Sequence, residues 1–232
     1  QIREERMEES SQVLRDRHLA WMRRRLSRVN YLLALDHFLA QQNIHDDVFQ
    51  MYLERLQPVF LYLATVYWKR EETQAAYFCH FLAKHQPQRN TEMDSLQQVV
   101  LSYLKKDSLY CRINALKALC GFGSPETLVN ALLELGRGSG IQLHEKVVTE
   151  ALLAYTGNAE ELSESLWKKF DQFSLQIQRS VLDYIRFRSG DYRRPMGEIL
   201  RDTGRNKELR IAAIRYFGRY PDPSAKEILL DF

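Results

Sequence analysis

Hydrophobic and polar positions along this chain follow the period of an α-helix almost throughout. Between about Glu4 and Gln41 there is no glycine or proline. Apolar residues recur there at every third or fourth position, at Leu19, Met22, Leu26, Val29 and Leu33. That spacing places them on one face of a helix. The pattern therefore predicts one long N-terminal helix.

A second helical region follows a polar connection at residues 41–47. Residues 47–70 are rich in apolar side chains and contain one proline, Pro58. Proline removes a backbone hydrogen bond and clashes with the preceding turn, so we expect the helix to be interrupted or kinked there. No stretch of the chain sustains the alternation of a β-strand, and the predicted fold class is all-α. We expect residues 1–72 to form an N-terminal helical region that packs on the remainder.

From residue 73 onward the chain repeats itself with a period of about 34 residues. Each segment contains an apolar-periodic helix, a turn such as GFGSPE, YTGNAE or RYPDPS, and a second helix. The turns carry glycine for a left-handed helix end and Ser, Asn or Asp to cap the next helix. A fixed period of this size is typical of a solenoid. Four full segments and a partial one can be placed in register: 73–107, 108–141, 142–174, 175–207 and 208–232.

Two of these segments resemble HEAT repeats. They are CRINALKALCGFGSPETLVNALLEL, from Cys111, and ELRIAAIRYFGRYPDPSAKEILLDF, from Glu208. The resemblance covers residues 108–232, is weaker over 73–107 and hardly extends to 1–72. It implies a right-handed α–α superhelix of about four to five helix pairs. Tetratricopeptide repeats have a nearby period, but their Trp-Leu-Gly-Tyr pattern is not met. The positions that carry the resemblance are Arg112, Ala115, Ala118, Leu119, Leu128, Leu132, Arg210, Ala213, Ile214, Phe217 and Leu229.

Composition excludes several classes of protein. The 232 residues are 45% hydrophobic, too apolar for a disordered chain, and the formal net charge of +3 gives no global case for binding nucleic acid. The three cysteines form no C-x-x-C pair, which argues against a disulfide framework or zinc module and favours the cytoplasm. No apolar run is long enough to cross a bilayer. The chain begins with Gln1, and an anchor upstream would place the domain at the cytosolic face of a membrane.

The sequence offers no catalytic signature. Neither G-x-S-x-G nor H-E-x-x-H occurs, and GRGSG at 136–140 falls between two repeats, where a helix end and linker are expected. We therefore predict no enzyme activity, no cofactor, no metal and no small-molecule substrate.

Charge is distributed unevenly along the repeats. Residues 126–165 contain seven acidic and two basic residues, whereas residues 186–219 contain ten basic and four acidic residues. Such a division would orient a charged protein partner. The alternative is that several arginines bond acids in neighbouring repeats. We predict a scaffold that binds another protein through its second helices, at Asn130, Glu134, Ser163, Trp167, Arg194, Glu198, Arg201 and Lys226.

A nucleic-acid-binding function is the alternative. The HEAT-like alkylpurine DNA glycosylases are similar in length and line a concave basic face with Trp, Asp and Arg. Trp167, Asp171 and Arg201 would be the corresponding residues here.

The three consecutive arginines at 23–25 point in different directions on a helix. The basic stripe that does align is Arg17, Arg24 and Arg28, at i, i+7 and i+11. It would face water, or an anionic membrane surface if an anchor precedes it.

Overall fold

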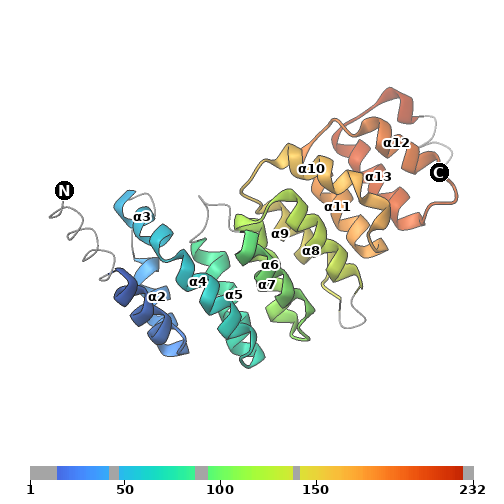
Figure 1. Cartoon of the computed structure of the whole chain (residues 1–232). Coiled ribbons are helices and arrows are strands. Elements are labelled where there is room, and N and C mark those ends of the chain that lie inside the picture. Colours follow the sequence, from blue (N-terminus) through green and yellow to red (C-terminus); the bar gives the residue numbers. More distant parts are fainter. Residues whose placement is uncertain (1–14, 42–46, 87–93, 138–141, 227–232) are drawn as a thin grey trace. The chain divides into compact units, whose positions relative to one another are not determined.

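The computed structural model describes residues 15–41, 47–86, 94–137 and 142–226. These residues contain helices and no strand, which confirms the all-α class. The chain divides into two compact units, Gln1–Ala118 and Leu119–Phe232 (Figure 1). Among the described residues, no helix combines the length and apolar character needed to span a bilayer.

The single long N-terminal helix predicted from the sequence is wrong. Residues 15–26 form one helix, and α2 (Val29–Ala40) begins a second. Between them Arg28 has an extended backbone, with φ −103° and ψ 126°. The Tyr67 hydroxyl donates a hydrogen bond of 2.7 Å to the carbonyl of Leu26. This bond satisfies a carbonyl at the end of the first helix and so stabilises the break.

The break changes which side chains are buried. Met22 and Leu26 lie in the core as expected, but Leu33 is 45% exposed, and Leu32 and Leu39 are buried in its place. This shift follows because α2 restarts the helical period after the extended residue.

The predicted basic stripe is also interrupted. Arg17, Arg24 and Arg28 are all exposed, but Arg28 lies outside both helices and does not continue the row of the other two.

The interruption predicted near Pro58 is confirmed. Helix α3 (Asp47–Arg55) ends two residues before α4 (Gln57–Trp68), and Pro58 lies in the first turn of α4. A proline is tolerated there because the first helical N–H groups have no intrahelical partner. The unit continues with α5 (Glu72–His85), α6 (Asp94–Ser102) and the short 3-10 helix η1 (Tyr103–Lys105).

The core of the first unit lies where α4 packs against α5 and α6. Tyr67 and Phe78 stack with 4.9 Å between ring centroids. The buried hydroxyl of Tyr103 donates to the carbonyl of Ala64 at 2.5 Å, so its polar end is satisfied inside the core. Helix α7 (Leu109–Phe122) crosses the division at Ala118.

The second unit consists of α8 (Pro125–Arg137), α9 (Glu145–Leu153), α10 (Ala159–Lys168), η2 (Phe170–Gln172), α11 (Leu175–Arg188), α12 (Arg193–Arg201), α13 (Lys207–Arg219) and η3 (Pro223–Ala225). Each of the segments 142–174 and 175–207 thus contains two α-helices joined by a turn. The predicted caps are present in two turns: Asn158 Oδ1 accepts from the N–H of Glu160 at 2.9 Å, and Ser124 Oγ accepts from the N–H of Thr127 at 3.2 Å. Helix α12 begins without a side-chain cap. The left-handed glycine helix ends predicted from the sequence are wrong, because no glycine that the structure describes has a positive φ, and α11 ends in extended backbone at Ser189.

Packing in the second unit joins equivalent helices of successive segments. Helix α11 packs against α9 on one side and α13 on the other, and α10 packs against α8. The buried side chains of these first helices include Val148, Leu152, Val181 and Ala213. The second helices α10 and α12 consequently border the same surface of this unit (Figure 1).

Candidate functional site

Two adjoining pockets in the second unit form a groove between α10 and α12, here called the α10–α12 groove. One has a volume of about 450 Å³ and the other about 260 Å³, and Pro195 lines both. The first is lined by Ala159, Glu160, Ser163, Glu164, Arg188, Ser189, Asp191, Tyr192 and Pro195. The second is lined by Trp167, Phe170, Asp171, Pro195, Glu198, Ile199, Asp202 and Arg205.

Helical spacing explains why these side chains meet. On α10, Glu160, Glu164 and Trp167 follow one another at i, i+4 and i+7, so they share one face. On α12 and just beyond it, Pro195, Glu198 and Asp202 follow at i, i+3 and i+7. The two facing rows form the walls of the groove.

Three aromatic rings lie in the middle of the groove. Trp167 stacks on Phe170 with 4.9 Å between centroids and meets Tyr192 edge-on at 5.4 Å. The backbone N–H of Tyr192 donates to the hydroxyl of Tyr216 at 3.0 Å, which fixes the start of α12. These rings offer a preformed apolar surface in which a cation over the indole face would be favoured.

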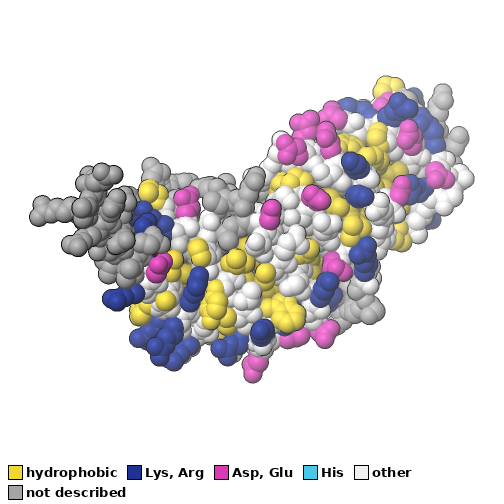
Figure 2. Space-filling view, viewed as in Figure 1, with side chains coloured by type: hydrophobic (Ala, Val, Ile, Leu, Met, Phe, Trp, Pro, Cys, Tyr) yellow, Lys and Arg dark blue, Asp and Glu magenta, His cyan; other side chains and the backbone are white. Residues whose placement is uncertain are grey.

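The groove is acidic. Its lining contains six carboxylates and two guanidinium groups. Burial raises the pKa of Tyr192 to about 12, and the nearby carboxylates of Glu164, Asp191 and Glu160 contribute to this rise. Figure 2 shows acidic side chains gathered over α10. The groove therefore carries a negative potential on the side of α10.

Both arginines of the lining are already engaged. Arg205 Nη1 lies 2.7 Å from Asp171 Oδ1, and its Nε lies 3.8 Å from Asp202 Oδ2. Arg188 donates to the backbone carbonyl of Leu153. The carboxylates of Glu160 and Glu164, in contrast, form no ion pair with any residue that the structure describes. They are available to a cationic ligand.

The structure brings three of the predicted partner-binding residues into the groove. Trp167 and Glu198 line it directly. Ser163 lines it as well but is only 2% exposed, and its hydroxyl donates to the carbonyl of Ala159 at 2.7 Å, so a partner would reach little of it.

The other five predicted residues do not line the groove. Arg194 and Arg201 are exposed on α12, and the Arg194 Nε lies 3.3 Å from the Glu198 carboxylate. Asn130 and Lys226 are exposed, and Glu134 is half-buried on α8.

Sequence reasoning missed Glu160, Glu164, Asp191, Tyr192 and Pro195. The sequence does contain one sign of the groove, because Glu160, Glu164 and Trp167 stand at the spacing of one helix face. The partners of that row come from the following segment, and only the structure places them opposite.

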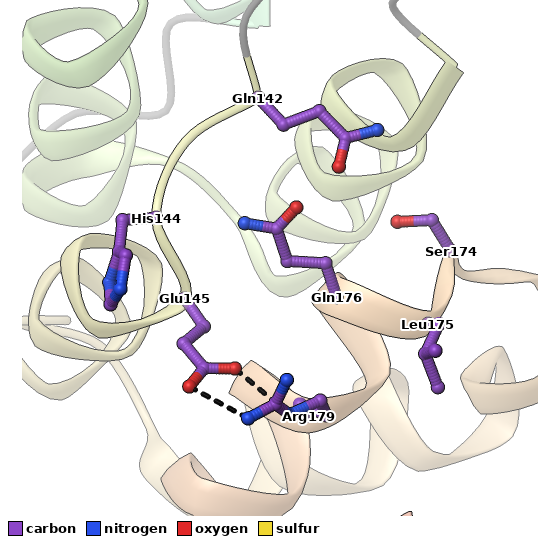
Figure 3. A pocket seen from close by; sticks show the side chains of 7 residues that line it. All are labelled: Gln142, His144, Glu145, Ser174, Leu175, Gln176 and Arg179. Atoms are coloured by element: carbon purple, nitrogen blue, oxygen red, sulfur yellow. Dashed lines mark hydrogen bonds and ion pairs between the residues drawn. The ribbon is translucent and has the colours of Figure 1, made fainter. Parts of the chain in front are cut away.

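A separate pocket of about 530 Å³ lies where α9 and α11 begin (Figure 3). In it Arg179 binds the Glu145 carboxylate through two contacts of 3.0 Å each. Its Nη2 also lies 3.4 Å from Glu208 Oε2. One arginine therefore joins α9, α11 and α13. Because its charge is balanced within the stack, this pocket is a structural junction, in line with the alternative that arginines bond acids of neighbouring repeats.

The first unit contains its own polar junction. Asp36 on α2 accepts hydrogen bonds from three groups of α5: the Tyr77 hydroxyl at 2.6 Å, Lys84 Nζ at 2.7 Å and His85 Nε2 at 2.6 Å. Burial acts to raise the pKa of Asp36, but these three donors outweigh it and hold the pKa well below its usual range. Burial lowers the pKa of His85. The junction ties α2 to α5.

Comparisons with protein-family models, with curated proteins and with solved structures gave no match to this chain.

Proposed function

We propose that this chain is a non-enzymatic α-solenoid scaffold of the cytoplasm that binds a lysine- and arginine-rich segment of another protein in the α10–α12 groove. The observation that carries the proposal is the lining of the groove. Six carboxylates line it together with Trp167 and Tyr192, and both arginines of the lining have partners. Asp171, Asp202 and Glu198 pair with arginines. Glu160 and Glu164 form no ion pair with any residue that the structure describes. A basic segment supplies the charge that this groove lacks.

The solenoid arrangement is supported by the order of contacts within the second unit. Helices α9, α11 and α13 pack side by side in chain order, as the first helices of stacked repeats would. Most positions that carry the HEAT resemblance are buried, as inter-repeat packing requires. The buried ones are Arg112, Ala115, Ala118, Leu119, Leu128, Leu132, Ala213 and Phe217. Ile214 and Arg210 are half-buried, and Leu229 lies outside the described residues.

Long basic side chains suit this groove for two reasons. A guanidinium or ammonium group gains from the exposed carboxylates of Glu160 and Glu164, although each such pair contributes only about 0.3–1 kcal/mol in contact with water. The aliphatic stem packs on aromatic surface while the charge remains solvated, and a cation over Trp167 contributes a further ~0.5–2 kcal/mol. Several such contacts along the groove are needed for useful affinity.

Nucleic acid is the less favoured ligand of the same surface. Of the three residues expected for a glycosylase-like site, Trp167 and Asp171 line the groove, but Arg201 does not. Asp171 is bound to Arg205 at 2.7 Å. Phosphate groups would meet the unpaired carboxylates of the lining, and like charges oppose binding.

A direct binding experiment tests the proposal. Fluorescence anisotropy would be measured with a labelled lysine- and arginine-rich peptide, a glutamate-rich peptide of the same length and a labelled DNA duplex. We expect saturable binding of the basic peptide that weakens as salt is added, because exposed ion pairs are screened. Retention of the duplex without binding of the basic peptide would overturn the proposal in favour of nucleic acid.

A further inference from the structure

The first unit exposes a second surface, formed by the helix at residues 15–26 and by α2. Large hydrophobic side chains stand in solvent there: Trp21 is 51% exposed, Phe38 50% and Tyr31 37%. Tyr31, Ala34 and Phe38 follow at i, i+3 and i+7 and share one side of α2.

Arg25 joins the exposed sides of the two helices. Its guanidinium carbon lies 5.7 Å from the centroid of the Trp21 ring and 5.0 Å from that of Tyr31. Arg25 also donates a hydrogen bond to the Tyr31 hydroxyl. Trp21, Arg25, Tyr31, Ala34 and Phe38 consequently form one continuous surface, here called the Trp21–Phe38 face.

Helix α2 carries apolar side chains on two sides. Leu32 and Leu39 lie in the core with 0% and 2% exposure, while Tyr31, Ala34 and Phe38 are exposed, on a side that also carries Asn30 and His37. Together with the exposed Trp21, these side chains suit a ligand that has both an apolar and a polar layer.

The same surface is strongly basic. Residues 15–28 contain six arginines and a single acid, Asp16. Arg17, Trp21 and Arg24 stand at i, i+4 and i+7 and so alternate along one side of the first helix. Arg17, Arg24 and Arg28 are exposed and form no ion pair with the described residues. Figure 2 shows basic side chains gathered at one end of α2. The ligand must also be anionic.

We infer that the Trp21–Phe38 face docks on the surface of a bilayer that contains anionic lipid. A bilayer surface presents lipid phosphates next to hydrocarbon. Arginine side chains bind the anionic headgroups, and Trp and Tyr side chains lie at the boundary between the headgroups and the hydrocarbon. A nucleic acid duplex has no apolar layer to meet the exposed rings of Trp21 and Tyr31. A second copy of the chain would bring the same unpaired arginines together. This inference goes beyond the proposed function and concerns the other unit.

Vesicle sedimentation with the full chain tests the inference. Vesicles of phosphatidylcholine with phosphatidylserine would be compared with vesicles of phosphatidylcholine alone. We expect binding to the anionic vesicles to be stronger by about tenfold or more, because each arginine near the surface adds to the attraction. The double variant Arg17→Glu, Arg24→Glu should lose this preference. Phe38→Ser should weaken binding at unchanged charge.

A matched control reverses two exposed charges elsewhere. Lys117→Glu with Arg215→Glu makes the same change in net charge on α7 and α13, and it should bind the vesicles far better than the Arg17→Glu, Arg24→Glu variant. Circular dichroism would verify that all variants fold.

Three outcomes would overturn the inference: equal binding to both kinds of vesicle, equal losses in the control and the test variant, or a concentration-dependent dimer that Phe38→Ser abolishes. The last would assign the face to a second copy.

Discussion

The indole of Trp167 on α10 meets the ring of Tyr192 edge-on, with 5.4 Å between centroids and 61° between planes. This contact spans the α10–α12 groove where its two pockets adjoin. Because Trp167 also stacks on Phe170, it is held in position before any ligand binds.

Removing the indole should therefore weaken the binding of a basic peptide to the groove. Trp167→Ala removes the cation-binding ring face, and we expect the dissociation constant to rise by about 5- to 30-fold. Trp167→Phe, which keeps a ring, should recover part of the loss. Anisotropy titrations of both variants measure the effect. Equal affinity of Trp167→Ala and the wild-type chain would show that the ring does not contact the peptide.

Removing Arg205 should have the opposite effect on binding. Its guanidinium lies 2.7 Å from Asp171 and 3.8 Å from Asp202, so Arg205→Ala frees two carboxylates of the lining. We expect the basic peptide to bind about two- to fivefold more tightly, at a stability cost below about 1 kcal/mol. Arg201→Ala removes a neighbouring exposed arginine that does not line the groove and serves as the control. Weaker binding by Arg205→Ala would mean that Arg205 itself holds the ligand.

Arg179 should matter for stability and not for binding. It forms two contacts of 3.0 Å with Glu145 and one of 3.4 Å with Glu208, and its side chain is 29% exposed. Arg179→Ala should lower the free energy of unfolding by about 1 kcal/mol, measured by urea denaturation. Arg179→Lys keeps the positive charge but loses the two-point contact with Glu145. Its free energy of unfolding should lie between those of the wild-type chain and Arg179→Ala. Impaired peptide binding by a folded Arg179→Ala variant would contradict the structural role.

The junction at Asp36 predicts a dependence of stability on pH. Its folded pKa is lowered, so it contributes stability above its unfolded pKa of about 3.9, and this contribution is lost as pH falls through the folded value. The lowered pKa of buried His85 likewise makes stability fall once pH drops below about 6.5.

Asp36→Asn should lower the free energy of unfolding at pH 7 by about 1–3 kcal/mol, because charge-assisted hydrogen bonds to Lys84 and His85 are lost. The difference from the wild-type chain should shrink below about pH 4, where Asp36 begins to take up a proton in the unfolded chain. Urea denaturation at several pH values measures this. Asp107→Asn, on an exposed carboxylate, is the control, and a pH-independent deficit in Asp36→Asn would contradict the role assigned to the charge.

Local sequence signals predicted much of the helical order. Asn158 and Pro58 lie where a helix begins, as the sequence predicted. Glycine was a poorer signal, because no described glycine has a positive φ and Gly136 and Gly218 lie inside helices. The break at Ser27–Arg28 has no such signal, because no glycine or proline is present. It is accompanied by the contact from Tyr67, 41 residues further along the chain, to the carbonyl of Leu26. Such long-range contacts are invisible in a hydrophobic pattern.

The groove was predictable only in part for a similar reason. Trp167 and Glu198 stand out on second helices, and both line the groove. The sequence also placed Arg194 and Arg201 on the predicted binding face, but neither lines the groove. The arginines that do line it, Arg188 and Arg205, bind the carbonyl of Leu153 and the carboxylate of Asp171, so the unpaired charge in the groove is acidic. Charge counts along a sequence do not show which charges face each other.

If the unpaired carboxylates of α10 hold a basic segment of a partner, removing their charge should weaken its binding. The most direct measurement is calorimetric titration of a lysine- and arginine-rich peptide into the wild-type chain and into the Glu160→Gln, Glu164→Gln variant. The double variant Glu126→Gln, Glu161→Gln removes the same charge from two exposed carboxylates that do not line the groove and is the matched control. We expect the Glu160→Gln, Glu164→Gln variant to bind about fivefold or more weakly and the control variant to bind like the wild-type chain. Equal affinity of the Glu160→Gln, Glu164→Gln variant and the wild-type chain would contradict this role of the carboxylates.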